Sequence, residues 1–310
     1  MAGNKLMEQY LKEFSRRRPV RAGSLIISIF GDSISQHGNS IWLGSLIESL
    51  EPFGLNARQI RTAVFRLVQE DWLVSKQVGR RSYYSFTDFG IRHYEKAARR
   101  IYAAKEEEWD GKWTVVVPAF ISNTKREQLR KELLWLGYGS IAPGLLAHPS
   151  GDRYSLDETL QEMGVTKEVV VLKAETEDLV SRACLKQLVH NSWKLEEISL
   201  RYEKFLEKYR SLTGSVRKNH KLEAQECFLI RTLLIHDFRR ILLNDADLPA
   251  ELLPVNWPGK TAFQLTARLY SQVHLGAKSY IMSNMETIDG HLPDVDKTYF
   301  RRFGGLENGR

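Results

Sequence analysis

The chain has few cysteines, no long apolar run and no pattern of metal ligands. Only two cysteines occur in 310 residues, Cys184 and Cys227, and both lie in apolar helical contexts. We therefore expect two buried thiols in a reducing, cytoplasmic compartment. No Cys or His pair has the spacing of a zinc site, so we expect no metal. No stretch approaches the roughly 20 apolar residues that cross a bilayer, and residues 1–14 lack the apolar core of a signal peptide.

Sequence signals of catalysis are missing as well. The chain contains no glycine-rich phosphate loop, no GxSxG motif and no paired carboxylates in an acid–base setting. Asp32 and Ser33 could suggest a catalytic pair, but no histidine follows at a suitable place, and we expect them to cap the end of a helix. The sequence therefore predicts a protein that is not an enzyme and holds no cofactor.

Positive charge is concentrated in the first third of the chain. Residues 1–105 contain 17 Lys and Arg against 9 Asp and Glu, whereas residues 106–310 contain 28 against 29. The first third thus carries a net charge of +8 and the remainder a net charge of −1. A basic domain joined to a neutral body indicates that a polyanion binds at one end of the molecule.

The segment from Leu55 to Trp72 has the pattern of a DNA recognition helix. Asn56 and Gln59 have the spacing of a capping box, which opens a helix. Apolar residues three and four apart predict one buried face, made of Ile60, Ala63, Val64 and Leu67. The opposite face carries no acidic residue before Glu70 and consists of Arg58, Arg61, Thr62, Phe65 and Gln69, with Arg66 at its edge. Arginine suits phosphate oxygens and the guanine edge, and a threonine methyl suits the thymine methyl.

The neighbouring segments predict a winged helix-turn-helix. A helix opened by Ser40 leads into the turn Glu51-Pro52-Phe53-Gly54, in which Gly54 can take a positive φ. Two strands, residues 73–78 and 82–87, are joined by a tip that contains Arg80 and Arg81, which is the pattern of a wing. A preceding apolar helix, residues 24–34, should support these elements. The residues expected to contact DNA are Arg58, Gln59, Arg61, Thr62, Arg66, Arg80 and Arg81.

Several strings resemble the PaaX family, the repressors of phenylacetic acid degradation. They are GDSISQHGNSIWLGSLIESL, IRTAVFRLVQEDWL, VGRRSYYSFTDFG, WDGKW, LLWLGYGSIAPGL, LLIHDFRRILLNDADLPAELLP and YFRRFGGL, and they span nearly the whole chain. The resemblance implies a sequence-specific transcriptional repressor of aromatic catabolism genes that phenylacetyl-coenzyme A releases from its operator. One departure is Asp71, where the family pattern has glycine before the tryptophan.

The expected fold class is α+β, mainly α, with five parts along the chain. These are a flexible arm (1–22), the winged helix-turn-helix (23–105), a ferredoxin-like coupling domain (106–178), a helical effector and dimerisation domain (179–300) and a tail (301–310). The arginines at positions 16–18 either touch phosphates or belong to a solvated tail, and the sequence leaves both possibilities open. The helical part is expected to contain a long amphipathic pattern in two pieces, a central helix over 222–243 and a further helix over 261–285.

The central part is expected to alternate three apolar segments (residues 113–120, 140–147 and 168–173) with two helices (residues 125–136 and 156–163), which suggests a small ferredoxin-like sheet. The resemblance implies a fold similar to the CRISPR-associated Cas2 proteins, and with it a rival function, that of a metal-dependent nuclease. Such nucleases are expected to offer an aspartate at the end of the first strand. Here that place is occupied by Pro118-Ala119-Phe120. We therefore interpret the domain as a coupling or dimerisation scaffold.

An acyl-coenzyme A effector would need basic groups for its phosphates and aromatic groups for its phenyl ring. The candidate effector residues are Trp193, Tyr202, His236, Arg239 and Arg240. The alternative is that Asp237, Arg239 and Arg240 form internal ion pairs and that the aromatic residues belong to the core. An architectural DNA-binding protein without a ligand also remains open. We expect a homodimer on double-stranded operator DNA, because one winged helix reads too few bases.

Overall fold

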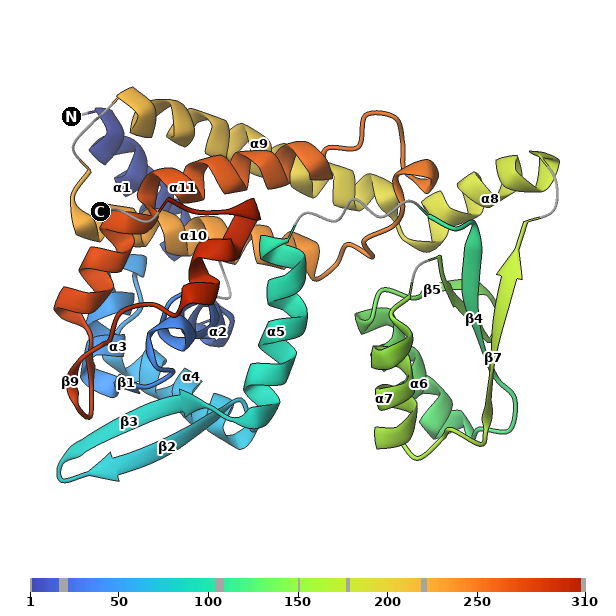
Figure 1. The fold of residues 1–310 in the computed structure, drawn as a ribbon, viewed down its shortest axis with the longest axis horizontal. Coiled ribbons are helices and arrows are strands. Elements are labelled where there is room, and N and C mark those ends of the chain that lie inside the picture. The colour runs from blue at the N-terminus through green and yellow to red at the C-terminus, as the bar shows by residue number, and fades with distance from the viewer. Residues whose placement is uncertain are drawn as a thin grey trace. The chain divides into compact units, whose positions relative to one another are not determined.

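The computed structural model describes residues 2–16, 22–103, 109–149, 151–176, 179–218 and 222–307. Within these ranges the chain is α+β and mainly α, as predicted, with helices α1 to α11 and three small sheets (Figure 1). It divides into two compact units, each made of segments that are far apart in the sequence. The first unit comprises residues 1–104, 205–239 and 261–310, and the second comprises residues 105–204 and 240–260.

The predicted recognition helix and its neighbours lie in the first unit. The helices here are α2 (Ala22–Asp32), α3 (Leu43–Leu50), α4 (Ala57–Gln69) and α5 (Asp88–Tyr102), with short turns of 3-10 helix at η1 (Ile34–His37) and η2 (Glu51–Phe53). Strands β1 (Ile41–Trp42), β2 (Leu73–Val78) and β3 (Arg81–Phe86) form an antiparallel sheet in the order β1-β3-β2. The helix expected to open at Ser40 in fact begins at Leu43, because Ile41 and Trp42 are extended and pair with Tyr84 and Tyr83.

The expected flexible arm is a helix, which corrects the prediction for this segment. Residues Ala2–Arg16 form α1, in which Tyr10 and Phe14 are buried. The Tyr10 hydroxyl donates to the carbonyl oxygen of Lys208 at 2.7 Å, and the ring of Phe14 meets Phe53 edge-on at 6.0 Å. Aromatic residues four apart share one face of a helix, and here that face packs on the helix-turn-helix and on α9. Residues 17–21, with two of the three expected arginines, lie outside the described residues.

The carboxy-terminal helices are long, as predicted. They are α9 (Leu195–Lys218), α10 (Ala224–Leu242) and α11 (Gly259–Asn284), followed by β8 (Glu286–Thr287), β9 (Gly290–His291) and η4 (Lys297–Gly304). The expected two pieces of the amphipathic pattern are α8 (Leu179–Ser192) and α9, and Lys194 with φ 50° lies between them.

The end of the chain returns to the amino-terminal elements within the first unit. His37 Nδ1 lies 2.6 Å from the carbonyl oxygen of Pro293, and since a carbonyl can only accept, the imidazole donates this hydrogen bond. The Asp296 amide donates to Gln36 O at 3.1 Å, and the Glu286 amide donates to Ser45 Oγ at 3.1 Å. Burial lowers the pKa of His37 to about 4, so its ring is neutral at pH 7.

The second unit is built on a four-stranded antiparallel sheet in the order β5-β6-β4-β7. Its elements are β4 (Lys112–Pro118), α6 (Asn123–Trp135), β5 (Gly139–Ala142), β6 (Leu145–His148), α7 (Arg153–Glu162), β7 (Val169–Glu175), α8 and η3 (Ala250–Leu252). The apolar segment expected as one piece over 140–147 is a hairpin of two strands, because Pro143 and Gly144, with φ 79° at the glycine, turn the chain. The resulting β-α-β-β-α-β order is that of ferredoxin-like domains.

Strand β4 has buried residues on both faces, as its apolar run predicts, whereas Val170 and Leu172 of the neighbouring β7 are 45% and 48% exposed. Val116 belongs to a core shared with α6 and α7, which lie on one face of the sheet (Figure 1). Trp113, which points to the opposite face, belongs to a core with Val189 of α8 and Leu248.

The expectation of two buried thiols is wrong for one of them, since Cys184 is exposed on α8 while Cys227 is buried. In the part of the chain that the structure describes, no helix is both long and apolar enough to span a lipid bilayer.

Candidate nucleic-acid interface

Helix α4 begins with the predicted capping box. The Asn56 side chain accepts a hydrogen bond from the Gln59 amide at 2.9 Å, and the Gln59 side chain accepts one from the Asn56 amide at 2.9 Å. The predicted apolar face is buried, with Ile60 and Val64 almost completely enclosed. Each such side chain contributes roughly 1.5–3 kcal/mol when it leaves water. The orientation of α4 is therefore fixed by its apolar face, and its other face is presented to solvent.

The outward face of α4 is cationic and rich in hydrogen-bonding groups. The exposed residues are Arg58, Gln59, Arg61, Thr62, Phe65, Arg66 and Gln69. Thr62 Oγ1 donates to Arg58 O at 2.9 Å, so Thr62 can offer a partner its methyl group and an oxygen lone pair. The side-chain oxygen of Gln59 is used by the capping box, which leaves its amide donors free for other contacts. The geometry thus places all five predicted contact residues of the helix on its solvent side.

The turn before α4 brings three elements together. Gly54 has φ 80°, as expected for a glycine that ends a helical turn, and its amide donates to Glu51 O at 2.9 Å. A Cβ atom at this position would lie 2.5 Å from the Cβ atom of Ser15 on α1. Both the backbone conformation and the close approach of α1 therefore require glycine here.

The residue that departs from the family pattern, Asp71, lies at the end of α4 with φ 60°. This left-handed conformation explains why glycine is expected at the position, since glycine adopts it without steric cost. Aspartate is among the residues that tolerate it best. The carbonyl oxygen of Asp71 accepts a hydrogen bond from Thr87 Oγ1, which also caps α5 by accepting from the Gly90 amide at 3.0 Å. The helix, the sheet and α5 are thus joined at this corner.

Strands β2 and β3 form the predicted hairpin, with a turn one residue shorter than expected. Val78 pairs with Arg81, so the turn consists of Gly79 and Arg80 alone. Gly79 has φ 59°, and nothing lies within 4 Å of the place a Cβ would take. Arg80 is exposed at the tip. A cation there can reach the phosphates that flank the groove occupied by a recognition helix.

Arg81, the second predicted wing arginine, already has partners within the first unit. Its guanidinium lies 4.3 Å from the ring centroid of Trp42, and Arg81 Nη1 donates to Glu286 Oε2 at 2.6 Å. Glu286 belongs to β8, so the end of the chain supplies a carboxylate to the wing. Among the described residues, Arg80 at the tip of the hairpin has no carboxylate partner, whereas the charge of Arg81 is balanced by Glu286.

We expect the Glu286→Gln variant to bind double-stranded DNA more tightly than the wild type. Removal of the carboxylate frees the Arg81 charge for a phosphate, so the slope of log K against log salt should steepen by about 0.9. Fluorescence anisotropy measures this slope when the binding constant is determined at salt concentrations from about 50 to 300 mM. Glu251→Gln, which removes the same charge from an exposed site of the second unit, is the control. An unchanged slope in Glu286→Gln would mean that Arg81 does not meet DNA.

A buried ionic cluster, which the sequence does not predict, lies at the end of α2, the helix that packs against α4. Asp32 at the end of α2 was expected to cap a helix; instead its carboxylate accepts from Arg231 Nε at 2.8 Å and from Arg302 Nη1 at 2.9 Å. The hydroxyl groups of Tyr102 and Tyr270 donate to the same carboxylate at 2.6 and 3.0 Å. Ser33 likewise does not cap η1, since its hydroxyl oxygen accepts from Arg231 Nη2 at 2.8 Å.

The cluster keeps its charges although it is buried. Burial alone would raise the pKa of Asp32, but the positive charges of Arg231 and Arg302 outweigh it and lower that pKa. Asp32 in turn holds Arg231 charged against its own burial, and raises the pKa of that guanidinium. The residues come from α2, α5, α10, α11 and η4, so one carboxylate joins five elements of the first unit. An arginine within the apolar run of residues 227–235 was the signal in the sequence, because such a cation needs a buried partner.

The five candidate effector residues belong to different compact units. His236 and Arg239 lie in the first unit, and Trp193, Tyr202 and Arg240 lie in the second. Trp193 Nε1 donates to Gly137 O at 2.8 Å, and the Tyr202 hydroxyl donates to Asp245 Oδ2 at 2.6 Å. His236 Nδ1 is 3.1 Å from Ser28 Oγ. Most of these polar groups thus have partners in the protein, and their role toward a ligand stays a prediction.

Arg239 differs from the other four candidates. It is 6% exposed, and its Nε and Nη1 atoms are buried without a hydrogen-bond partner in the described part of the chain. Burial lowers the pKa of this arginine, since the charged form is poorly solvated. Asp237 forms an internal ion pair, as the alternative interpretation predicts, and its carboxylate accepts from Lys208 Nζ at 2.9 Å and from the Tyr209 hydroxyl at 3.0 Å. A buried guanidinium of this kind fits an anionic group of a ligand.

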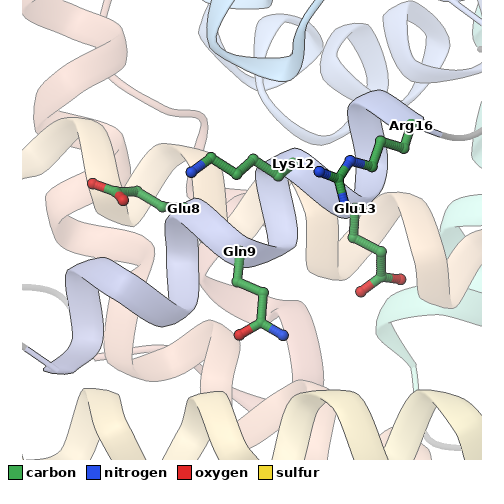
Figure 2. Close-up of a pocket in the computed structure, with 5 residues that line it drawn as sticks. All are labelled: Glu8, Gln9, Lys12, Glu13 and Arg16. Atoms are coloured by element: carbon green, nitrogen blue, oxygen red, sulfur yellow. The ribbon is translucent and has the colours of Figure 1, made fainter.

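Two other features of the described chain do not have the composition of a ligand or metal site. A surface hollow beside α1 is lined by Glu8, Gln9, Lys12, Glu13 and Arg16, which point to several sides of the helix (Figure 2). Its two acids balance its two bases, and it contains no aromatic residue, so its composition does not match that of an acyl-coenzyme A site. Among the described residues, no group of three or more His, Cys, Asp and Glu side chains is placed to hold a metal ion.

Comparison with known proteins identifies the family. Residues 21–90 match the family model of PaaX-like proteins, residues 106–185 match the central Cas2-like domain of PaaX proteins, and residues 193–283 match the PaaX-like C-terminal domain. The chain is 38% identical over 301 residues to the transcriptional repressor PaaX of Escherichia coli strain K12, which covers 97% of this chain and 95% of the relative. A solved structure of an uncharacterized protein from Mycobacterium tuberculosis is 22% identical, with a TM-score of 0.50, and the match covers 82% of this chain and 98% of that one. That likeness concerns the fold alone. The identity and coverage of the Escherichia coli repressor, together with three matching family models, show that this chain belongs to the PaaX family.

Proposed function

We propose that the protein is a sequence-specific repressor that binds operator DNA through a winged helix made of α3, α4, β2 and β3, and that it controls genes of phenylacetic acid catabolism. The observation that carries the proposal is the outward face of α4. This face is exposed, contains three arginines and has no acidic residue along the helix. Membership of a family with a transcriptional repressor supports the same role.

The proposed contacts follow from the chemistry of the groove. Arg58 and Arg61 read guanine or clamp phosphates, and Thr62, Gln59 and Arg66 lie beside them. Arg80 meets phosphates from the wing. The protein acts as a homodimer on a partly palindromic operator, since two symmetry-related helices double the base contacts of one.

The proposed effector is phenylacetyl-coenzyme A, which weakens operator binding. Support comes from the family and from Arg239, whose buried Nε and Nη1 atoms have no hydrogen-bond partner among the described residues and would fit a phosphate group of the ligand. The ligand need not touch α4. It needs only to bind more tightly to a conformation in which the two recognition helices do not match the operator.

The proposal predicts that phenylacetyl-coenzyme A lowers operator affinity about 5- to 150-fold, the range of a typical allosteric coupling. A mobility-shift titration of DNA upstream of the target genes, with and without the thioester, measures this loss. Phenylacetate and coenzyme A alone serve as controls, and each should act weakly because each lacks part of the ligand. Arg239→Met should bind DNA normally but respond less to the thioester.

Linkage supplies a second readout of the same proposal. Operator DNA must weaken thioester binding by the same factor by which the thioester weakens DNA binding. Calorimetric titration of the thioester into the free protein and into the protein–operator complex tests this. Equal affinities in the two titrations would exclude release by this ligand and would favour a DNA-binding protein that does not respond to it.

A further inference from the structure

Phe65 is a large apolar residue on the face of α4 that is otherwise cationic. Its side chain is 64% exposed, whereas Ile60, Val64 and Leu67 of the same helix are at most 3% exposed. Burial of a phenylalanine side chain stabilises a protein by roughly 1.5–3 kcal/mol relative to leaving it in water. The fold gains only a minor part of this free energy at position 65, although the neighbouring residue Val64 belongs to the buried face of the helix.

The position of Phe65 is the middle of the proposed contact surface. Residues three and four apart are neighbours on a helix, so Arg61 and Thr62 lie one turn before Phe65 and Gln69 lies one turn after it. Arg58 continues the same row by a further turn. The aromatic ring is therefore flanked along the helix by groups that suit phosphates and base edges, and any DNA that contacts Arg58 and Gln69 together must cover Phe65.

The major groove offers one apolar group to such a ring. Each base pair presents hydrogen-bonding atoms there, and only thymine adds a methyl group, at C5. Contact with this methyl removes both apolar surfaces from water, whereas a guanine or adenine edge would leave polar atoms against the ring without partners. Apolar side chains that insert between base pairs usually do so from the minor groove, which is too narrow for an α-helix to enter.

We propose that Phe65 determines specificity by contacting the C5 methyl group of a thymine near the centre of each operator half-site. This inference rests on the proposed DNA-binding function and adds a named base to it. Phe65 supplies discrimination at this thymine, in addition to any base contacts of Arg58 and Arg61, and the arginines supply the electrostatic affinity. The two contributions differ in kind, because a methyl contact is independent of salt and a phosphate contact is not.

The test begins with in vitro selection of bound duplexes from a random library by the full chain. Each thymine of the selected site is then replaced singly by deoxyuridine, which removes only the methyl group. The wild type should lose about fourfold in affinity at one thymine of each half-site, the value expected for about 0.8 kcal/mol per buried carbon. Phe65→Ala should bind the thymine and uracil duplexes equally well, with the salt dependence of the wild type.

A matched control is available in the second unit. Phe120 is 84% exposed, so Phe120→Ala removes the same ring from another surface without disturbing a core. It should discriminate thymine from uracil as the wild type does. Phe65→Leu, which keeps an apolar side chain, should retain part of the discrimination.

The outcomes separate this inference from the function on which it rests. A selected site that has no thymine, or whose thymines can all be replaced by uracil without loss, would overturn the role of Phe65 while leaving a DNA-binding protein. The role of Phe65 would also be overturned if the Phe65→Ala variant still preferred thymine over uracil. The same holds if sedimentation showed that the variant had lost its dimeric state and that this loss alone accounted for its weaker binding. A selection that enriches no duplex would instead refute the proposed function.

Discussion

Replacement of Asp32 by asparagine is expected to lower the free energy of unfolding by about 3–5 kcal/mol, as for other buried ion pairs that lose one partner. The variant keeps the size of the side chain but removes the negative charge that faces Arg231 and Arg302 at 2.8 and 2.9 Å. Two guanidinium groups would then remain buried without a counter-charge. Urea denaturation measures the loss, and hydrogen exchange of the α10 amides assigns it to the first unit.

The same variant has a defined pH dependence. Because the pKa of Asp32 is lowered in the folded protein, its charge contributes stability that is fully present above the ordinary value of 3.8. This contribution is lost as the pH falls through the lowered pKa. The difference in the free energy of unfolding between the wild type and Asp32→Asn should therefore be constant from about pH 5 to 8, where Asp32 is ionised in both the folded and the unfolded wild type. The difference should shrink in stronger acid.

Asp157→Asn is the matched control for this prediction. Asp157 forms an ion pair with Arg153 at 2.8 Å, but both side chains are about half exposed. Such a pair contributes only about 0–1 kcal/mol. A loss in Asp32→Asn no larger than that in Asp157→Asn would show that the buried cluster does not hold the first unit together.

The second large effect is expected in the double variant Arg58→Ala, Arg61→Ala. Loss of an arginine that contacts a base costs about 1–3 kcal/mol, so two such losses, if additive, weaken specific binding by about 2–6 kcal/mol. Both residues are exposed on α4, so stability should change little. Competition between the selected duplex and nonspecific DNA in anisotropy measurements gives the loss of affinity and of specificity together.

Arg80→Ala is the comparison for this variant. It should weaken binding to all sequences alike and flatten the salt dependence by about one unit, as expected of a phosphate contact. If the double variant of α4 lost affinity without losing specificity, its arginines would contact phosphates rather than bases. If Arg80→Ala changed sequence preference but not the salt slope, the wing would not be where it is proposed to be.

Local signals in the sequence predicted the surface of the candidate site well. The capping box of Asn56 and Gln59, the apolar spacing from Ile60 to Leu67 and the glycine turn at Gly54 all depend on residues within a few positions of one another. Their geometry is confirmed atom by atom. Periodicity also predicted the long carboxy-terminal helices and the doubly covered strand β4. It failed where two short strands with a turn between them, β5 and β6, resemble one apolar segment.

Partners that are distant in the sequence could not be predicted in this way. Asp32 has no nearby opposite charge in the sequence, so it could be interpreted only as a cap, and the pairing with Arg231 and Arg302 bridges 199 and 270 positions. The same holds for Arg81 and Glu286, which are 205 positions apart. The segment before residue 17 was interpreted as an arm because its sequence is mostly polar. Among residues 8–16 only Tyr10 and Phe14 are buried, and the groups that bury them come from distant parts of the chain.

The sequence by itself determined the exposed face of α4 that is proposed to meet DNA, and the tertiary structure decided how the surrounding elements are held together. An outward face is specified locally, because helix periodicity and the charge of exposed side chains need no information from the rest of the chain. A buried charge is specified globally, because the cost of taking it out of water must be offset by partners that only the folded chain brings within hydrogen-bond distance. The exposed cationic face of α4 could therefore be predicted from about 18 consecutive residues, roughly the window in which periodicity is informative. The connection of α2, which packs against α4, to α10 and η4 through Asp32, Arg231 and Arg302 could be seen only in the fold.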